Sequence, residues 1–157
     1  MSDCIFCAIV TGEIEASLVY ADDVTMAFMD LRQPNGGHVL VVPRQHVEMI
    51  DDLNAVTGAA LMQAVIRTTR AVRKSLQPAG ISIWQSNGAA AGQEVPHVHF
   101  HVLARQPADS LLRVYAEKPP YPDRASLNQL AITIRRGYTT PHDGGEDGSG
   151  GAVEQRV

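Results

Sequence analysis

Three histidines, His97, His99 and His101, alternate with hydrophobic residues in the run His-Val-His-Phe-His-Val-Leu. Valine and phenylalanine favour extended backbone, so this run predicts a β-strand. Successive side chains of a strand point to opposite faces, so we expect the histidines to share one face and the hydrophobic side chains to enter a core on the other. A lone histidine on a strand is most often structural. Three imidazoles on one face add little packing, so their spacing indicates chemistry.

The composition is that of a globular chain with one domain. The 157 residues are 45% hydrophobic and 19% charged, which is enough to form a sizeable core. The formal net charge of -4 argues against bulk nucleic-acid binding. No hydrophobic stretch approaches the roughly 20 residues of a membrane span, and the N-terminus lacks the features of a secretory signal. We therefore expect a cytoplasmic protein without a nucleic-acid or membrane partner.

The order of patterns along the chain predicts an α+β domain on an antiparallel sheet. A short helix is followed by a hairpin, a third strand, a long helix, two more strands and a second helix. The corresponding segments are 4–10, 18–20, 24–29, 38–42, 52–76, 81–85, 97–103 and about 127–134. Residues 141–157 are polar and Gly-rich, which predicts a disordered tail after a domain of residues 1–140.

The long helix is expected to begin at a cap supplied by Asp51 or Asp52. Residues at helical spacing predict its buried stripe: Leu53, Val56, Ala60, Val65, Thr69, Val72 and Leu76. Leu61, Met62 and Ile66 fall outside this narrow stripe.

Cys4 and Cys7 form a Cys-x-x-Cys motif and are the only cysteines of the chain. The motif is compatible with redox chemistry, with two inert thiols on a short helix, or with half of a zinc site. No βαβ pattern surrounds it, which argues against the redox interpretation. A structural zinc site needs four Cys or His ligands. His46 follows a predicted strand and His97 begins another, so both are available as further ligands.

Several other segments accompany the histidine run in a characteristic order. They are Ile5-Phe6, Phe28-Met29-Asp30, Gly37-His38-Val39-Leu40-Val41-Val42-Pro43-Arg44-Gln45-His46, Asn87-Gly88 and Gly92-Gln93-Glu94. Together with the histidines, these segments resemble the histidine triad (HIT) family over about residues 4 to 105. The resemblance implies a HIT-like fold, with a roughly five-stranded antiparallel sheet, one long helix and one C-terminal helix. It also implies a homodimer with the long helix at the interface.

The resemblance implies a nucleotide hydrolase or transferase that acts on the α-phosphate of purine nucleotide conjugates, as a nucleoside phosphoramidase does. His99 is then the nucleophile that forms a covalent nucleotidyl-histidine, because neutral imidazole is a good nucleophile near pH 7. His101 contacts the phosphate and assists charge and proton movement, and His38 supports the triad. The remaining expected contacts with the nucleotide come from Ile5, Phe6, Ile9, Phe28, Asp30, Leu31, Asn87, Gln93 and Glu94.

The chain resembles the bacterial type of the family with an N-terminal Cys-x-x-Cys motif, and many bacterial members that carry this motif use equivalent positions as a zinc site. The resemblance therefore implies structural Zn²⁺ on Cys4, Cys7, His46 and His97, with no metal needed for the chemistry. In that arrangement His97 is structural and does not transfer protons.

Three other functions are compatible with the same residues. One is a dinucleoside polyphosphate hydrolase, and another is a nucleotide-binding regulatory protein with little catalysis. A third is a metal hydrolase in which the three histidines hold a catalytic zinc, although no carboxylate motif accompanies the strand. The chain also departs from the best-studied phosphoramidases: Glu94 replaces a hydroxyl residue, Ala104 replaces a proline common in several branches, and the Trp-containing C-terminal ending is absent. The leaving group and the choice between adenine and guanine are therefore left open.

Overall fold

The computed structural model describes residues 4–111 and 119–138, and it has the predicted α+β fold. The first compact unit ends at Leu111, and the C-terminal helix belongs to a second unit. In chain order the elements are α1 (Ile5–Thr11), β1 (Leu18–Ala21), β2 (Thr25–Met29), β3 (His38–Pro43), a 3-10 turn (Ile50–Asp52), α2 (Ala55–Leu76), β4 (Gly80–Gln85), a second 3-10 turn (Ala89–Ala91), β5 (Phe100–Arg105) and α3 (Arg124–Gly137).

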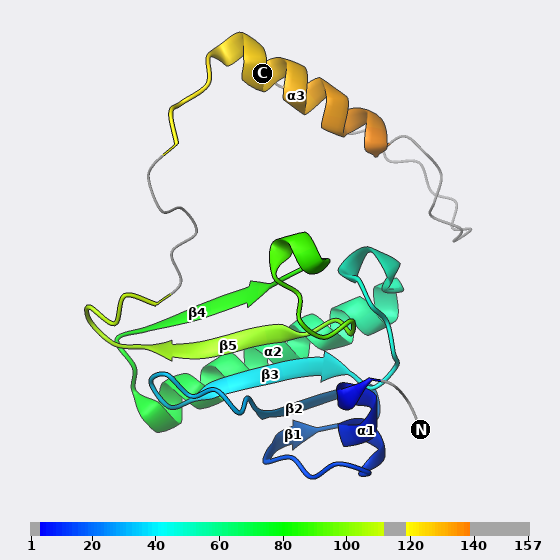
Figure 1. The fold of residues 1–157 in the computed structure, drawn as a ribbon, viewed down its shortest axis with the longest axis vertical. Helices are drawn as coiled ribbons and strands as arrows, with labels where there is room; N and C mark the ends of the chain where they lie inside the picture. The colour runs from blue at the N-terminus through cyan, green and yellow to red at the C-terminus, as the bar shows by residue number, and fades with distance from the viewer. Residues whose placement is uncertain (1–3, 112–118, 139–157) are drawn as a thin grey trace. The chain divides into compact units, whose positions relative to one another are not determined.

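The strands of the first unit form one antiparallel sheet in the order β1-β2-β3-β5-β4 (Figure 1). The histidine strand β5 is an interior strand, between β3 and β4, so residues of both neighbours can reach its histidines. Its pairing register places His38 opposite Leu103 and Trp84 opposite His101. The expected five-stranded antiparallel sheet is therefore confirmed.

The strand that carries the histidines begins later than predicted. Regular pairing starts at Phe100, and His97 and His99 lie in the segment that leads into β5. The reason is that the His97 ring, rather than a strand backbone, donates a hydrogen bond of 2.9 Å to the carbonyl of Pro43. The backbone N–H of Val98 instead donates to Val47, which follows β3.

The predicted alternation of faces is confirmed despite this shift. Val98, Phe100 and Val102 pack with Leu61 and Val65 in a core cluster between the sheet and α2, which covers this face of the sheet (Figure 1). The histidine side faces a second cluster, which contains Phe6 of α1 and Phe28 of β2. The Phe6 ring centroid lies 5.9 Å from that of His97 and 5.2 Å from that of His99. The sheet therefore has one purely structural face and one face that carries the histidines.

The start and the buried stripe of α2 differ from the predictions. Asn54 caps the helix, because its side chain accepts a hydrogen bond from Thr57 N–H, whereas Asp51 and Asp52 lie in the preceding 3-10 turn. Val56 is 76% exposed. The residues that α2 does bury are Thr57, Leu61, Ala64, Val65, Thr68 and Val72.

The predicted stripe included Val56 because it is hydrophobic, although its position in the helical period places it on the outer face. Leu61 and Val65 fix the direction of the buried face, and a helix of 3.6 residues per turn then brings Thr57 inward and turns Val56 outward. Threonine is tolerated there because its methyl group packs like that of valine.

The second unit contributes α3, as the spacing of Leu127, Leu130, Ala131 and Ile134 predicts. Its N-terminus is capped by Asp123, whose side chain accepts a hydrogen bond from Ser126 N–H at 2.7 Å. The tail predicted for residues 141–157 lies outside the described residues. Within the described ranges, no helix has the length and hydropathy needed to cross a membrane.

Candidate active site and metal centre

A hydrogen bond to the backbone selects the tautomer of the buried His99 ring. His99 Nδ1 lies 2.7 Å from the carbonyl oxygen of His97. A carbonyl oxygen only accepts hydrogen bonds, so Nδ1 carries the proton. The lone pair of the neutral ring is then on Nε2. His99 lines a cavity, so this ring has the electronic form that a nucleophile requires.

His38 and His101 form a hydrogen-bonded chain beside His99. His38 Nδ1–H donates to the Arg32 carbonyl at 3.0 Å, which leaves its Nε2 to accept from His101 Nδ1–H, also at 3.0 Å. The His99 and His101 ring centroids are 4.9 Å apart. The Asp30 carboxylate lies 3.6 Å from His38 Nδ1. The chain provides a route by which charge on His101 is stabilised through His38.

Trp84 of β4 fixes the orientation of His101. The two rings are stacked with centroids 4.2 Å apart and an interplanar angle of 1°. The contact follows from the register, which pairs Trp84 with His101. Sequence reasoning missed this residue. The available signal was the single tryptophan of the chain, which lies in the predicted strand before the histidine run.

Burial keeps two of the histidines neutral at pH 7. It lowers the pKa of His101 to about 4, with smaller contributions from His99 and His38, while Asp30 and Glu94 act in the opposite direction. Burial also lowers the pKa of His97. A neutral His101 keeps the hydrogen bonds described above, because each ring then has one donor and one acceptor nitrogen.

The lowered pKa of His101 predicts a loss of stability in acid. Between its ordinary pKa of 6.5 and the folded value of about 4, the unfolded chain binds a proton that the folded chain does not. Stability contributed by neutral His101 is therefore present above pH 6.5 and is lost as the pH falls toward 4. We expect the free energy of unfolding, measured from thermal melts, to fall between pH 6.5 and 4 by on the order of 2 kcal/mol less in His101→Gln than in the wild type, after allowance for partial exposure. An equal fall in the two proteins would contradict the prediction.

The histidines open onto a cavity of about 830 Å³. One part of its lining is apolar and includes Ile5, Phe6, Ile9 and Phe28, and another part contains His38, His99 and His101. Of the residues expected to contact the nucleotide, the structure places seven in the lining: Ile5, Phe6, Ile9, Phe28, Asp30, Leu31 and Glu94. Leu31 is nevertheless 97% exposed and lies at the rim. A hydrophobic pocket joined to a group of imidazoles suits a ligand with an apolar ring at one end and an anionic group at the other.

Asn87 and Gln93, which were expected to hold phosphate oxygens, are not part of this lining. The Asn87 side chain accepts from Ile50 N–H and donates to Asp51. The Gln93 side chain accepts from Gly88 N–H and donates to the Glu48 carbonyl. Both amides therefore hold the loop between β4 and β5 against the segment that precedes α2, and their role toward phosphate stays a prediction.

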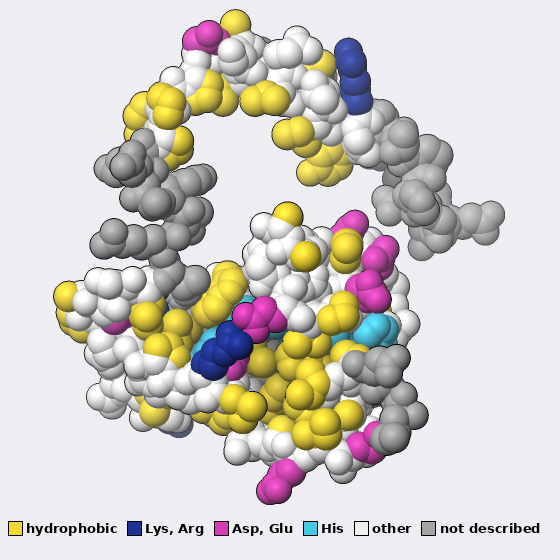
Figure 2. Space-filling view, viewed as in Figure 1, with side chains coloured by type: hydrophobic (Ala, Val, Ile, Leu, Met, Phe, Trp, Pro, Cys, Tyr) yellow, Lys and Arg dark blue, Asp and Glu magenta, His cyan; other side chains and the backbone are white. Residues whose placement is uncertain are grey.

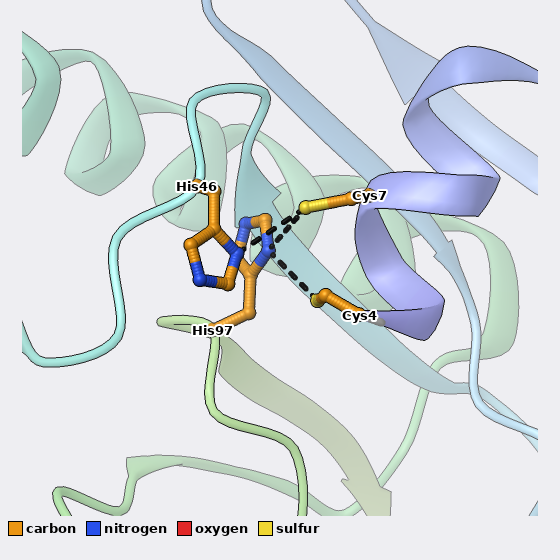
Figure 3. A group of neighbouring side chains, drawn as sticks. All are labelled: Cys4, Cys7, His46 and His97. Carbon is orange, nitrogen blue, oxygen red and sulfur yellow. Dashed lines mark hydrogen bonds between the residues drawn. The ribbon is translucent and has the colours of Figure 1, made fainter. Parts of the chain in front are cut away.

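Cys4, Cys7, His46 and His97 form a second group, and their side chains point toward one another (Figure 3). Cys4 caps α1 and Cys7 lies within it, whereas the histidines come from the segments after β3 and before β5. Their ligand atoms all lie within 4.8 Å of one another. The Sγ atom of Cys7 lies 3.2 Å from His46 Nδ1 and 3.6 Å from His97 Nδ1, and Cys4 Sγ lies 3.5 Å from the latter.

These distances fit a tetrahedral zinc ion. Zinc–ligand bonds of about 2.3 Å to sulfur and about 2.05 Å to nitrogen place sulfur and nitrogen about 3.6 Å apart. His97 Nε2–H donates to the Pro43 carbonyl, so the lone pair is on Nδ1, which faces the two thiols. A backbone carbonyl that orients a ligating histidine in this way is typical of metal sites. The four residues could therefore hold a structural metal ion.

Comparison with known proteins identifies the family. The HIT domain family model matches residues 11–108, which include His38, His99 and His101. The chain belongs to the HIT family. A HIT-like protein of Methanocaldococcus jannaschii is 40% identical over 114 residues, which cover 73% of this chain and 88% of that protein. An adenosine 5′-monophosphoramidase of Schizosaccharomyces pombe is 33% identical over 102 residues, covering 65% of this HIT protein and 74% of the relative. An adenylylsulfatase of Arabidopsis thaliana is 31% identical over 110 residues, covering 70% and 56%.

Solved structures of other HIT proteins have the same fold. A HIT family protein from Bacillus subtilis superposes with a TM-score of 0.81 at 30% identity, covering 86% of this chain and 96% of that one. A zinc-bound histidine triad protein from Mycobacterium smegmatis superposes with a TM-score of 0.65 at 33% identity, covering 83% and 97%. The HIT-like fold predicted from the sequence is confirmed.

Proposed function

We propose that this HIT protein is a nucleotide hydrolase that acts on the α-phosphate of purine nucleotide conjugates, with phosphoramidates as the favoured class. The observation that carries the proposal is the 2.7 Å hydrogen bond from His99 Nδ1–H to the His97 carbonyl. It leaves Nε2 of a cavity-lining imidazole available to attack phosphorus. Two relatives named as an adenosine 5′-monophosphoramidase and an adenylylsulfatase support the reaction class.

The reaction takes two steps that share one covalent intermediate. The His99 Nε2 lone pair forms a bond to the α-phosphorus while the bond from phosphorus to the leaving amine breaks, and the amine nitrogen takes up a proton from solvent water. Water then attacks the same phosphorus and loses a proton to His101 Nε2, and the bond between phosphorus and His99 Nε2 breaks. The products are a nucleoside monophosphate and a free amine. His101 lies beside His99, and its Nδ1–H is bonded to His38, so its Nε2 lone pair can accept the proton of the attacking water. The imidazolium formed in that way stabilises the phosphoryl oxygens, and His38 supports it through their hydrogen bond.

The apolar end of the cavity is proposed to hold the base. Phe6 and Phe28 are packed edge to face, with centroids 5.5 Å apart, and Ile5 and Ile9 extend the same surface. Asp30 lines the same cavity, and its carboxylate lies 3.6 Å from His38 Nδ1, where it suits the ribose hydroxyls. Zinc held by Cys4, Cys7, His46 and His97 would supply a structural cross-link and takes no part in the two steps.

Intact-protein mass spectrometry after rapid mixing and quenching tests the proposal. The probes are phosphoramidates of adenosine and guanosine together with a dinucleoside polyphosphate. A nucleotidyl adduct that is absent in His99→Ala supports the covalent mechanism, and the probe that gives it identifies the base and leaving group. Turnover of the polyphosphate alone would favour the dinucleoside polyphosphate hydrolase. Nucleotide binding without adduct or turnover would favour a regulatory protein, and turnover that requires metal bound at His99 would favour a metal hydrolase.

We also propose a homodimer that uses the outer face of α2. Met62 and Ile66 are half-exposed on this helix, and Val56 is exposed near its start. Twofold pairing would cover these side chains and is the commonest form of oligomer. We expect light scattering at micromolar concentration to give twice the chain mass, and Ile66→Glu to shift it toward the monomer. A monomer mass for the wild type would refute the dimer.

A further inference from the structure

Arg32 and Glu94 form an ion pair between two segments that both line the cavity. Arg32 Nη1 lies 3.0 Å from Glu94 Oε1. Arg32 belongs to the segment between β2 and β3, and Glu94 to the segment between β4 and β5, 62 residues further along the chain. Both residues line the cavity together with His99 and His101. On the face drawn in Figure 2, basic and acidic side chains meet beside histidine atoms and a broad group of hydrophobic side chains.

The pair is too exposed to be explained by stability. The side chains of Arg32 and Glu94 are 76% and 67% exposed. Exposed ion pairs add little to stability and exchange partners readily. The pair between Arg105 and Asp109 is different, because its side chains are only 21% and 8% exposed and Asp109 also accepts from Asn35. The Arg105–Asp109 pair is tied into the fold, because Arg105 also donates to Ser82 of β4 and Asn35 donates to Asp109. The Arg32–Glu94 pair instead leaves both charges available to a ligand.

The two charges act directly on the histidine end of the cavity. The hydrogen bond and charge of Arg32 lower the pKa of the Glu94 carboxyl, and a positive charge on His101 or His99 would lower it further. Glu94 is therefore ionised at neutral pH and lies within electrostatic range of both histidines. Asp30 is a second carboxylate that acts on His101, and it already accepts a hydrogen bond from the Arg32 backbone N–H at 2.7 Å. Glu94 and Arg32 are thus the charged side chains there that a substrate can engage without breaking the histidine chain.

We propose that the Arg32–Glu94 pair selects the leaving group, with Glu94 favouring amines and opposing phosphate chains, and with Arg32 moderating that preference. This inference rests on the proposed nucleotidyl transfer at His99. When an amine leaves, the bond between phosphorus and nitrogen breaks and the nitrogen takes up a proton, so a carboxylate nearby is favourable. When a phosphate chain leaves, the bond between phosphorus and oxygen breaks and the departing oxygen keeps the electron pair. The added negative charge is then repelled by Glu94 and attracted by Arg32.

The test compares one nucleotide with two leaving groups. kcat/KM is measured for an adenosine phosphoramidate of an alkylamine and for a diadenosine polyphosphate, so that contributions of the base pocket cancel in the ratio. We expect Glu94→Gln to change the ratio about tenfold in favour of the polyphosphate, and Arg32→Gln to change it about tenfold toward the amine. Both changes should shrink at high salt, because the residues are exposed.

Matched controls separate a local effect from a change in net charge. Asp23→Asn and Arg70→Gln remove the same charges from exposed positions outside the cavity lining, and they should leave the ratio unchanged. Ratios in Glu94→Gln and Arg32→Gln that equal those of the controls would overturn the inference while leaving the nucleotidyl transfer intact. Shifts of both variants in the same direction would also overturn it. Absence of turnover of either substrate by the wild type would overturn the proposed function, and the inference with it.

Discussion

Replacing His99 by alanine is expected to lower kcat by at least about a thousandfold, because it removes the proposed nucleophile. Nucleotide binding should be largely retained, since the apolar end of the cavity is formed by Phe6, Phe28 and their neighbours. The measurement is steady-state turnover of a nucleoside phosphoramidate together with the dissociation constant of the product nucleotide. Activity of the variant equal to that of the wild type would exclude His99 as the nucleophile.

Chemical rescue distinguishes a nucleophile from a residue that only shapes the site. His99→Gly leaves a space the size of the ring, and added imidazole can attack the α-phosphorus from it. Rescue should saturate with imidazole and should be weaker for His101→Gly, because the His101 position is proposed to stabilise charge and not to form the covalent bond. A His99→Gly variant that is folded, binds nucleotide and shows no rescue would favour a structural role for the ring.

The faces of the sheet could be predicted from the sequence, but the start of the histidine strand β5 could not. Alternation of histidine with valine and phenylalanine determines which side chains share a face, and this holds whether or not the backbone is paired. Strand pairing itself depends on which donor, a backbone N–H or a side chain, bonds to each carbonyl of the neighbouring strand, and these groups are far apart in the chain. The Pro43 carbonyl bonds to the His97 ring instead of a strand N–H, so regular pairing begins only at Phe100.

The beginning of α2 shows a similar limit. Asp51, Asp52 and Asn54 are all good capping residues within one turn, and local preference does not separate them. In the structure Asp51 and Asp52 close a separate 3-10 turn, and this leaves Asn54 to cap the first turn of α2.

Some residues of the candidate site could be predicted from the sequence and others could not. The histidines, the cysteine pair and the apolar residues of the cavity could be predicted because motifs carry them. Trp84 and Arg32 could not, because they reach the site through strand register and through a loop contact across 62 residues. Asn87 and Gln93 show the opposite case: their residue types suit phosphate binding, but their amides bond to the loop and to the segment before α2.

Purified protein is expected to contain about one zinc per chain, and removing the metal should lower the melting temperature by about 10 °C or more. The reason is that Cys4 and Cys7 of α1 would be joined to His46 and His97, which lie 39 and 90 residues from Cys7. A cross-link over such distances restricts the unfolded chain strongly. Elemental analysis and melts with and without a chelator make the measurement. Absence of zinc from protein prepared without chelators would count against the site.

Combining the Cys4→Ser substitution with a chelator separates the effect of losing the metal from the effect of losing a side chain. Cys4→Ser should lower zinc content and melting temperature, and a chelator should then have little further effect on the variant, because the same cross-link has already been lost. A full chelator effect in Cys4→Ser would mean that the stabilising metal binds elsewhere. Loss of the metal should affect turnover less than stability, and it should affect turnover through His97. The His97 side chain belongs to the metal group, while its carbonyl accepts the His99 Nδ1–H bond that leaves Nε2 free for attack. Zinc at this position would therefore hold the nucleophile in place without contacting the substrate.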